Sequence, residues 1–425
     1  MAHIDKFGLI DILQSAYRLG HGVETALAKI KNDIDRAIDD GKGAIMVLLD
    51  GSAAFDLVNI DILLKRLKIG FGVSDHVISW FSSYLRHRRQ QVMINSSISD
   101  EIELNIGVQQ RSILGPLLYL IYITPLSRLI RNHDVMNHGY ADDVQLYKFF
   151  LRNCQTSLYN AISKVNGCID DVSKWMVQNR LKLNGDKTEF MLIGTQPFIR
   201  NLRDFPHLIV NGSRVYNKPV VRNLGAKFDN ILSMSAQIND VVRICTYLMR
   251  GIRRVKHFVD YRVLNTLVVT NVLSRIDFVN CLFTGLSSYS LHKLDVVINN
   301  AARLIVNVPV RNHITPTLIN LHWLKPKFRI EYRCIVMIYK CIHNYNMPSY
   351  IKDMFQVYKP VRVTRLTVNG HYIMCPRFRT TFGERCFQIT AINLWNSLPN
   401  EMQEIERLNV FKRKLKTYLF QKCYN

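Results

Sequence analysis

Apolar residues follow a helical period at both ends of the chain, and shorter apolar runs fill the region between. In the first 45 residues they recur every three or four positions and stop at a pair of glycines, which predicts a helix there. The residues that carry this period are Leu27, Ile30, Ile34 and Ile38. Residues 44–49 (AIMVLL) are continuously apolar, as is typical of a strand buried on both faces, and Asp50 follows directly.

Strands and helices alternate from there to about residue 225. Asp61 and Ser74 are each predicted to begin a helix, the first ended by Gly70 and the second with an apolar face. That face comprises Val77, Trp80, Phe81 and Tyr84. Further helices are expected over residues 114–123 and 170–183, and strands over residues 91–94, 102–106 and 190–193. Residues 136–150 predict two strands around a turn that contains Asp142 and Asp143, so the pattern favours an α+β fold.

Beyond residue 225 the pattern is mostly helical. Helical periodicity covers residues 238–255, 263–278, 290–306 and 411–420. We therefore expect a domain boundary near residue 225 and a second one near residue 305.

The distribution of charge separates two halves of the chain more clearly than the distribution of apolar residues does. The net charge is +23. Residues 1–195 contain 22 basic and 21 acidic residues, a net of +1, whereas residues 196–425 contain 34 basic and 12 acidic residues, a net of +22. A cationic half of this kind is typical of a chain that binds a polyanion such as nucleic acid.

Other classes of protein fit less well. The nine cysteines form no CxxC pair, which argues against a zinc site and fits a reducing compartment. Residues 112–127 are uncharged but too short and too interrupted by proline to span a membrane. We expect an intracellular protein of the nucleus or cytoplasm with no membrane partner; its oligomeric state is not predicted.

Three carboxylates are the candidate chemistry. Asp50 stands where a strand stops, and Asp142 and Asp143 stand between two strands. Carboxylates gathered at one sheet edge would suit Mg²⁺, which prefers oxygen ligands, and a pair of such ions supports nucleotidyl transfer. The spacing alone equally fits ordinary turn residues, because Asp is common in turns.

Several sequence boxes in a fixed order resemble the reverse transcriptases of LINE-type (non-LTR) retrotransposons, particularly chicken-repeat and jockey-like elements. These boxes lie at residues 14–27 (QSAYRLGHGVETAL), 48–67 (LLDGSAAFDLVNIDILLKRL), 107–123 (GVQQRSILGPLLYLIYI), 140–147 (YADDVQLY), 175–194 and 221–229. The resemblance continues into residues 301–305, 314–324, 394–399 and 411–420.

This resemblance implies a role for each matching residue. Asp50, Asp142 and Asp143 match the catalytic, metal-binding aspartates, which implies two Mg²⁺ ions, with Mn²⁺ as an alternative. The nucleotide-binding positions are Phe55, Gln110, Ser112 and Lys187. Leu224 and Gly225 match the hairpin that grips the primer. The partners implied are an RNA template, a DNA primer and deoxynucleotide triphosphates.

The resemblance also implies an order of domains. Residues 1–45 match a residual fingers segment, 46–225 the palm, 226–305 a helical thumb and 306–425 a basic C-terminal region. The fold expected is a reverse transcriptase palm, a sheet with packed helices, followed by a mostly helical basic part. The upstream fingers and the endonuclease of the family have no counterpart in this sequence.

Four positions depart from the family pattern. Gln109 replaces a proline, Arg111 a glycine, Gly51 a leucine and Asn59 an aspartate. Arginine at position 111 is expected to crowd the template or nucleotide, because glycine permits close approach and positive φ. The main hypothesis is an RNA-directed DNA polymerase domain; the alternative is a truncated, catalytically impaired remnant that only binds nucleic acid.

Overall fold

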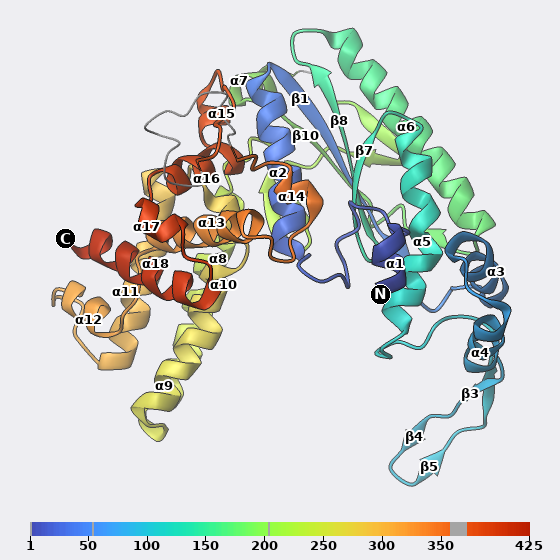
Figure 1. Ribbon diagram of the computed structural model, residues 1–425, viewed down its shortest axis with the longest axis horizontal. Coiled ribbons are helices and arrows are strands. Elements are labelled where there is room, and N and C mark those ends of the chain that lie inside the picture. Colours follow the sequence, from blue (N-terminus) through green and yellow to red (C-terminus); the bar gives the residue numbers. More distant parts are fainter. Residues whose placement is uncertain (1, 53–54, 203–204, 358–371) are drawn as a thin grey trace. The chain divides into compact units, whose positions relative to one another are not determined.

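The chain forms two compact units in the computed structural model, which describes residues 2–52, 55–202, 205–357 and 372–425. The first unit comprises Met1–Arg18, Gly43–Leu192 and Arg200–Lys218, and the second comprises Leu19–Lys42, Ile193–Ile199 and Pro219–Asn425. Both strands and helices are present, as the α+β prediction required (Figure 1). The domain boundaries expected at residues 45, 225 and 305 remain predictions.

A four-stranded sheet in the order β10-β1-β8-β7 is the centre of the first unit. Its strands are β1 (Lys42–Leu49), β7 (Met136–Tyr140), β8 (Asp143–Leu151) and β10 (Glu189–Ile193). Strand β1 is buried along almost its whole length, which confirms the strand predicted from the apolar run. Strands β7 and β8 pair antiparallel around the predicted turn, with Tyr140 opposite Asp143.

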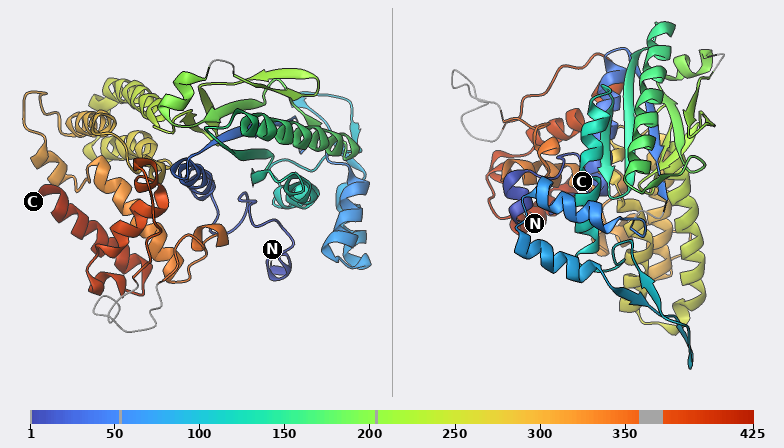
Figure 2. Two further views of the ribbon diagram at one scale, coloured as in Figure 1. Left: turned by 90° about the horizontal axis from the view of Figure 1, so that it is seen from above. Right: turned by 90° about the vertical axis from the view of Figure 1, so that its right-hand side faces the viewer.

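Two long helices cover this sheet. Helix α5 (Gly115–Arg131) packs against β7, helix α6 (Gln155–Gln178) packs against β8, and the two helices contact each other (Figures 1 and 2). The predicted span 170–183 was wrong at both ends. The apolar period of α6 already begins at Leu158, and residues Lys182–Leu183 form β9, which pairs with β2 (Gly51–Ser52).

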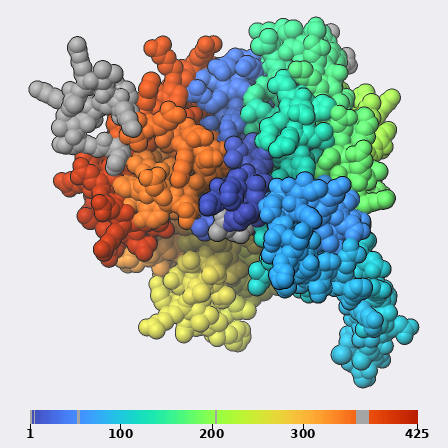
Figure 3. Space-filling model, turned by 45° about the vertical axis from the view of Figure 1, so that its right-hand side comes forward, coloured from blue at the N-terminus to red at the C-terminus, as the bar shows by residue number. Residues whose placement is uncertain are grey.

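The remaining elements of the first unit are short. They are α1 (Ala2–Phe7), α3 (Ile60–Phe71), α4 (Asp75–Leu85), β3 (Arg88–Gln90), β4 (Met93–Ile94), β5 (Ser97–Ile98), β6 (Ile102–Leu104), β11 (His207–Val210) and β12 (Ser213–Tyr216). Strands β3 to β6 build a hairpin that extends away from α3 and α4, as Figure 3 shows in light blue beside the blue helices.

The predicted ends of α3 and the predicted face of α4 need correction. Asn59, not Asp61, caps α3, because its Oδ1 accepts the Ile62 N–H at 3.0 Å, and Gly72, not Gly70, ends the helix in the left-handed conformation. Helix α4 buries only Leu85. Its predicted apolar face stays largely open: Trp80 is 55% exposed and stacks on Tyr84.

Helices dominate the second unit. They are α2 (Val23–Asp39), α8 (Ser235–Val255), α9 (Tyr261–Val268), α10 (Ser274–Asp277), α11 (Ser288–Val306), α12 (Thr315–Asn320), α13 (Pro326–Ile342), α14 (Ser349–Lys352), α15 (Thr381–Glu384), α16 (Phe387–Asn396), α17 (Asn400–Gln403) and α18 (Leu408–Tyr424). Helix α7 (Gln196–Asn201), a π-helical stretch at Val269–Leu273, 3-10 turns at Lys256–Phe258 and Asn280–Phe283, and the hairpin of β13 (Val220–Asn223) and β14 (Ala226–Asp229) complete the chain.

An aromatic cluster holds α13, α16 and α18 together. Tyr339 stacks on Phe411 with ring centroids 3.9 Å apart, and Trp395 lies beside both rings. Phe411, Leu415 and Leu419 are buried on one face of α18, as the helical period over residues 411–420 predicted. Within the described residues, no helix combines the length and the apolar character needed to cross a membrane.

Candidate active site

The strand ends bring the three predicted carboxylates to neighbouring positions. Asp50 follows the last residue of β1, and Asp143 is the first residue of β8, the strand next to β1 in the sheet. Asp142 occupies the turn between β7 and β8. Residues almost a hundred positions apart in the sequence therefore lie close enough for their charges to interact.

Gln14 fixes the turn that carries the acidic pair. Its Oε1 accepts the Ala141 N–H at 3.1 Å, and its Nε2 donates to the Ala141 carbonyl at 3.4 Å. Ala141 has φ +56°, which is unfavourable for a residue with a Cβ atom, so these bonds stabilise a strained turn. Sequence reasoning missed Gln14, although it is the first residue of the first matching box.

Burial, together with neighbouring negative charge, raises the pKa of both turn carboxyls. Burial is the largest cause for Asp142, and the Asp50 charge adds to it, although Lys187 acts in the opposite direction. For Asp143, loss of hydration around the carboxyl and the charges of Asp142 and Asp50 raise the pKa to about 6. A like-charged group of this kind is typical of a functional site rather than of a structural one.

Lys187 is the basic group of this site. Its Nζ lies 3.5 Å from Asp50 Oδ2, and two-thirds of the side chain is exposed. Asn184 positions its loop, because Asn184 N–H donates to the Asp50 carbonyl and Asn184 Oδ1 accepts the Lys187 N–H at 3.3 Å. The structure thus brings the predicted Lys187 to the predicted Asp50, through an asparagine that the sequence did not single out.

The donor set suits a hard divalent cation. Asp50 Oδ2 is buried and has no hydrogen-bond partner, and the neighbouring Asp142 and Asp143 add further carboxylate oxygens. As the side chains stand, however, no three His, Cys, Asp or Glu residues within the described part of the chain are grouped closely enough to hold a metal ion.

An aromatic pair lies near the acids. The ring of Phe55 stacks on Tyr119 of α5, with centroids 4.7 Å apart. The Tyr119 hydroxyl is buried near Asp142 and Asp143, and burial followed by these two charges raises its pKa. Phe55, which sequence reasoning would otherwise assign to a core, is therefore held on a platform next to the carboxylates.

The predicted nucleotide-contacting loop is tied to the segment that follows Phe55. The Val108 N–H donates to the Phe55 carbonyl at 2.8 Å. Gln110 Nε2 donates to both carboxylate oxygens of Asp56, at 2.8 and 2.9 Å. Sequence analysis did not single out Asp56, and the structure shows that it orients Gln110.

Ser112 and Arg111 have mainly conformational roles in this loop. The Ser112 hydroxyl donates to the Gln109 carbonyl at 2.7 Å and accepts the Gly115 N–H at 2.9 Å, so it supports the start of α5. Arg111 has φ +60°. The positive φ explains why glycine suits this position and indicates that arginine here strains the backbone.

Leu224 and Gly225 belong to the second unit. They form the two-residue turn of the β13–β14 hairpin, with φ +46° and +87°. Two positive φ angles are the signature of the tight hairpin turn that favours Asn-Gly. The structure therefore bears out a hairpin at these residues, whereas their contact with a primer stays a prediction.

Comparison with known proteins agrees with this geometry. The family model for "Reverse transcriptase (RNA-dependent DNA polymerase)" matches residues 2–228, which is more than half of the chain. The chain belongs to the reverse transcriptase family. Its resemblance to LINE-type and jockey-like elements, inferred from the sequence boxes, is confirmed by the relatives described next.

The relatives are polymerases of mobile elements. A probable RNA-directed DNA polymerase from transposon BS of Drosophila melanogaster is 24% identical over 73% of this chain and 34% of its own length. The RNA-directed DNA polymerase from mobile element jockey of the same species is 25% identical over 54% of this chain and 24% of its own. The chain therefore spans about a third or less of these relatives.

Among solved structures, the apo telomerase from Candida tropicalis aligns over 66% of this chain and 45% of its own, with 13% identity and a TM-score of 0.38. This likeness is too distant to support any statement about function.

Proposed function

We propose that this reverse transcriptase chain carries out RNA-directed DNA synthesis, in which a DNA primer is extended along an RNA template from deoxynucleotide triphosphates. The observation that carries the proposal is the coupling of three carboxylates across two neighbouring strands. Burial raises the pKa of both Asp142 and Asp143, the nearby Asp50 charge adds to it, and Lys187 offsets only part of the effect on Asp142. The family match supports the reaction class.

Asp50, Asp142 and Asp143 would hold two Mg²⁺ ions, with Mn²⁺ as an alternative. The buried Asp50 Oδ2, which has no hydrogen bond and only an ion pair with Lys187, and the raised carboxyl pKa values fit such ions. The chemistry supplied by the ions when bound is Lewis-acid polarisation of phosphoryl oxygens.

The other residues bind and select the nucleotide. Phe55, supported by Tyr119, presents a ring whose bulk would exclude a ribose 2′-hydroxyl. Lys187 would leave its contact with Asp50 to meet the phosphates, since an exposed lysine moves readily and pairs with phosphate as a point charge. Gln110, oriented by Asp56, would contact the nucleotide or template base pair, and Ser112 would keep its loop in place.

The second unit would hold the nucleic acid. Its lysines and arginines neutralise phosphates without reading sequence, and the Leu224–Gly225 turn would contact the primer. We place the reaction inside the cell, in the nucleus or cytoplasm. The nine unpaired cysteines, all within the described residues, support a reducing compartment.

A primer-extension assay tests the proposal. The purified chain is incubated with a labelled DNA primer annealed to RNA, the four deoxynucleotide triphosphates and Mg²⁺. Wild type should extend the primer, and Asp142→Ala should not. Asp170→Ala is the matched control, because Asp170 is exposed on α6 and pairs with Lys174 of the same helix.

Unchanged extension by Asp142→Ala would refute the assignment of the site. Salt-sensitive binding of primed RNA by a wild-type protein that extends nothing would instead support the nucleic-acid-binding remnant.

A further inference from the structure

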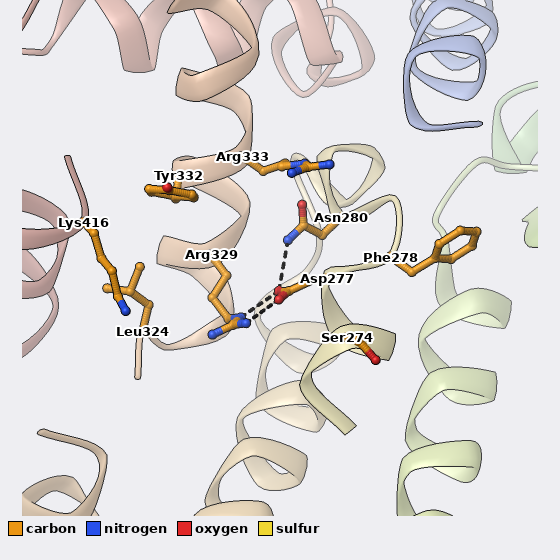
Figure 4. Close-up of a pocket in the computed structure, with 9 residues that line it drawn as sticks. All are labelled: Ser274, Asp277, Phe278, Asn280, Leu324, Arg329, Tyr332, Arg333 and Lys416. Atoms are coloured by element: carbon orange, nitrogen blue, oxygen red, sulfur yellow. Dashed lines mark hydrogen bonds and ion pairs between the residues drawn. The ribbon is translucent and has the colours of Figure 1, made fainter. Parts of the chain in front are cut away.

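A cavity of about 550 Å³ opens in the second unit, within the range of ~300–1,000 Å³ typical of small-molecule sites. Figure 4 shows that residues from three helical regions line it: the α10 segment and the turn after it, α13 and α18. None of the catalytic, nucleotide-binding or primer-binding positions assigned from the family resemblance lies among the lining residues, although Leu324 and Lys416 fall within matching segments. Its chemistry has three separate features.

Basic groups outnumber acidic ones in the lining. Arg329, Arg333 and Lys416 line the cavity together with one acidic residue, Asp277, and Arg333 is paired with Glu24 outside the lining. Arg329 Nε donates to Asp277 Oδ1 at 2.7 Å, and Arg329 Nη2 also contacts this carboxylate. A guanidinium has five N–H donors, so Arg329 Nη1 still has donors to offer, and the exposed Lys416 adds three more N–H donors. The cavity therefore favours an anion.

A buried acceptor is among the groups that line the cavity. Asn280 is only 3% exposed, and its Oδ1 has no hydrogen-bond partner. Its Nδ2 faces Asp277 Oδ1 at 3.5 Å, which fixes the amide orientation, because an ionised carboxylate only accepts. An unpaired buried acceptor is unfavourable, so a ligand that donates an N–H there would bind well.

Tyr332 supplies a flat apolar surface between these polar groups. It follows Arg329 by three positions on α13, so both side chains lie on the same side of the helix (Figure 4). The residue is partly exposed. A ring beside cationic groups is the combination on which the bases of single strands stack.

We propose that this cavity binds one nucleotide unit of a single-stranded nucleic acid. The phosphate lies toward Lys416 and Arg329, the base stacks on Tyr332, and a base N–H donates to Asn280 Oδ1. An acidic peptide would use the cations but has no flat base to stack on Tyr332, so the observations favour a nucleotide.

The cavity adjoins the hairpin turn assigned to the primer. Phe278 lines the cavity, and a Cβ atom added to Gly225 would lie 3.5 Å from Phe278 Cζ, so the ring stands next to that turn. Which strand enters the cavity rests on the proposed function; the existence of the nucleotide site does not.

Binding is therefore measured separately from synthesis. All variants are made in the Asp142→Ala background, and the anisotropy of a fluorescein-labelled single-stranded RNA of about 10 nucleotides reports affinity, a length within typical site sizes of ~4–16 nucleotides. Tyr332→Ala should weaken binding about 5- to 100-fold, and Tyr332→Phe should change it little, because the stacking ring remains.

Lys416→Gln and Lys414→Gln form a matched pair. Both residues are exposed on α18, but only Lys416 lines the cavity. Lys416→Gln should lower affinity and reduce the slope of log K against log salt by about 0.7, the value for one lost single-strand phosphate contact. Lys414→Gln should do much less. Equal losses would show that only the diffuse positive field acts and would overturn the proposal.

Asn280→Leu separates binding from folding. Removal of a buried unpaired acceptor should leave the melting temperature unchanged or raised, while RNA affinity falls. Unchanged affinity in a folded Asn280→Leu protein would contradict the site. Competition by polyglutamate as effective as that by RNA of equal charge would also overturn it, because the cavity would then recognise charge alone.

Discussion

Two groups of carboxylates, one in each unit, differ in how their charge is balanced. In the first unit, Asp142 and Asp143 lie near a third carboxylate, and their pKa values are raised. In the second unit, burial also pushes the pKa of Asp240 upward, but hydrogen bonds from Arg243 and Lys227 more than offset it, and the net pKa is lowered. An acid whose charge is balanced by basic partners stabilises the fold, whereas an acid without such balance destabilises it.

The contrast is between these two groups and not between the units as wholes, because burial also raises the pKa values of Asp295 and Glu331 in the second unit. The group around Asp143 persists although it opposes folding, as expected where a cation or substrate is needed to complete a site. The same distinction applies to Asp39 in the second unit. Its carboxylate accepts the backbone N–H groups of Arg379 and Thr380, which gives it a purely structural role at the start of α15.

The largest expected effect comes from neutralising an uncompensated acid. Asp143→Asn should reduce primer extension roughly a hundredfold or more, because a carboxylate that would hold the cation is lost. It should also raise the free energy of unfolding at pH 7 by about 1 kcal/mol, a value discounted for solvent screening.

The pH dependence of stability tests whether the raised pKa of Asp143 destabilises the folded protein near neutral pH. A carboxyl whose folded pKa of about 6 exceeds its unfolded value of 3.8 binds its proton more tightly when folded. Its contribution to stability is present below pH 3.8 and is lost as pH rises through 6. Denaturant titrations from pH 4 to 7 should show this loss in wild type and a smaller one in Asp143→Asn; parallel curves would contradict the comparison.

The reverse result is expected for a compensated acid. Asp240→Asn should lower the free energy of unfolding at pH 7 by about 1–2 kcal/mol, because Lys227 and Arg243 lose their partner. The lowered pKa means that this stabilisation is present above pH 3.8 and disappears as pH falls through the folded pKa. Urea unfolding at pH 7 and pH 3 measures it, with Asp170→Asn as an exposed control that should change stability little.

Relief of backbone strain should change stability by a smaller amount, and the change should be similar in the two units. Arg111 in the first unit and Leu224 in the second both have positive φ. Arg111→Gly and Leu224→Asn should each stabilise the protein by about 1 kcal/mol, measured from denaturant midpoints. Arg89→Gly, in strand β3, should instead destabilise it by roughly 0.5–1 kcal/mol. A loss of stability in both test variants would mean that side-chain contacts outweigh the strain.

The smallest effect concerns two glycines near opposite ends of strand β1. A Cβ atom at Gly51 would meet no atom within 4 Å, whereas one at Gly43 would lie 2.4 Å from Phe150 Cζ. Gly51→Ala should raise stability by about 0.4–1 kcal/mol, and Gly43→Ala should lower it. Thermal melts of the two variants should move in opposite directions; a shift in the same direction would show that the local space is misjudged.

Elements with strong periodicity were predictable from the sequence. The buried run of β1, the strand pair around the acidic turn and the helical face of α18 all follow from spacing alone. Helix ends were less predictable. Asn59, Asp61 and two nearby glycines are all plausible caps, and only the three-dimensional path decides which of them binds the backbone.

The supporting residues of the site were not predictable from local pattern. Gln14, Asp56 and Asn184 act through hydrogen bonds, some to residues far along the chain, and although all three lie inside matching boxes, their neighbouring residues do not reveal these bonds. The resemblance to a family supplied the residues proposed to touch substrate, whereas the structure supplied those that orient them. The exposed face of α4 shows a further limit of prediction from sequence. Its apolar period predicts a helix face but does not reveal whether a partner covers that face.

The amide of Gln14 has a consequence for how this protein can be shortened. Both of its polar ends are committed to Ala141, so a chain cut just after residue 14 would retain all three carboxylates yet lose the brace of the loop that bears two of them. Stepwise deletion from the amino terminus should therefore disrupt the site once Gln14 is removed, although this residue is uncharged and far from the acids in sequence. A fragment that keeps the site must begin upstream of it.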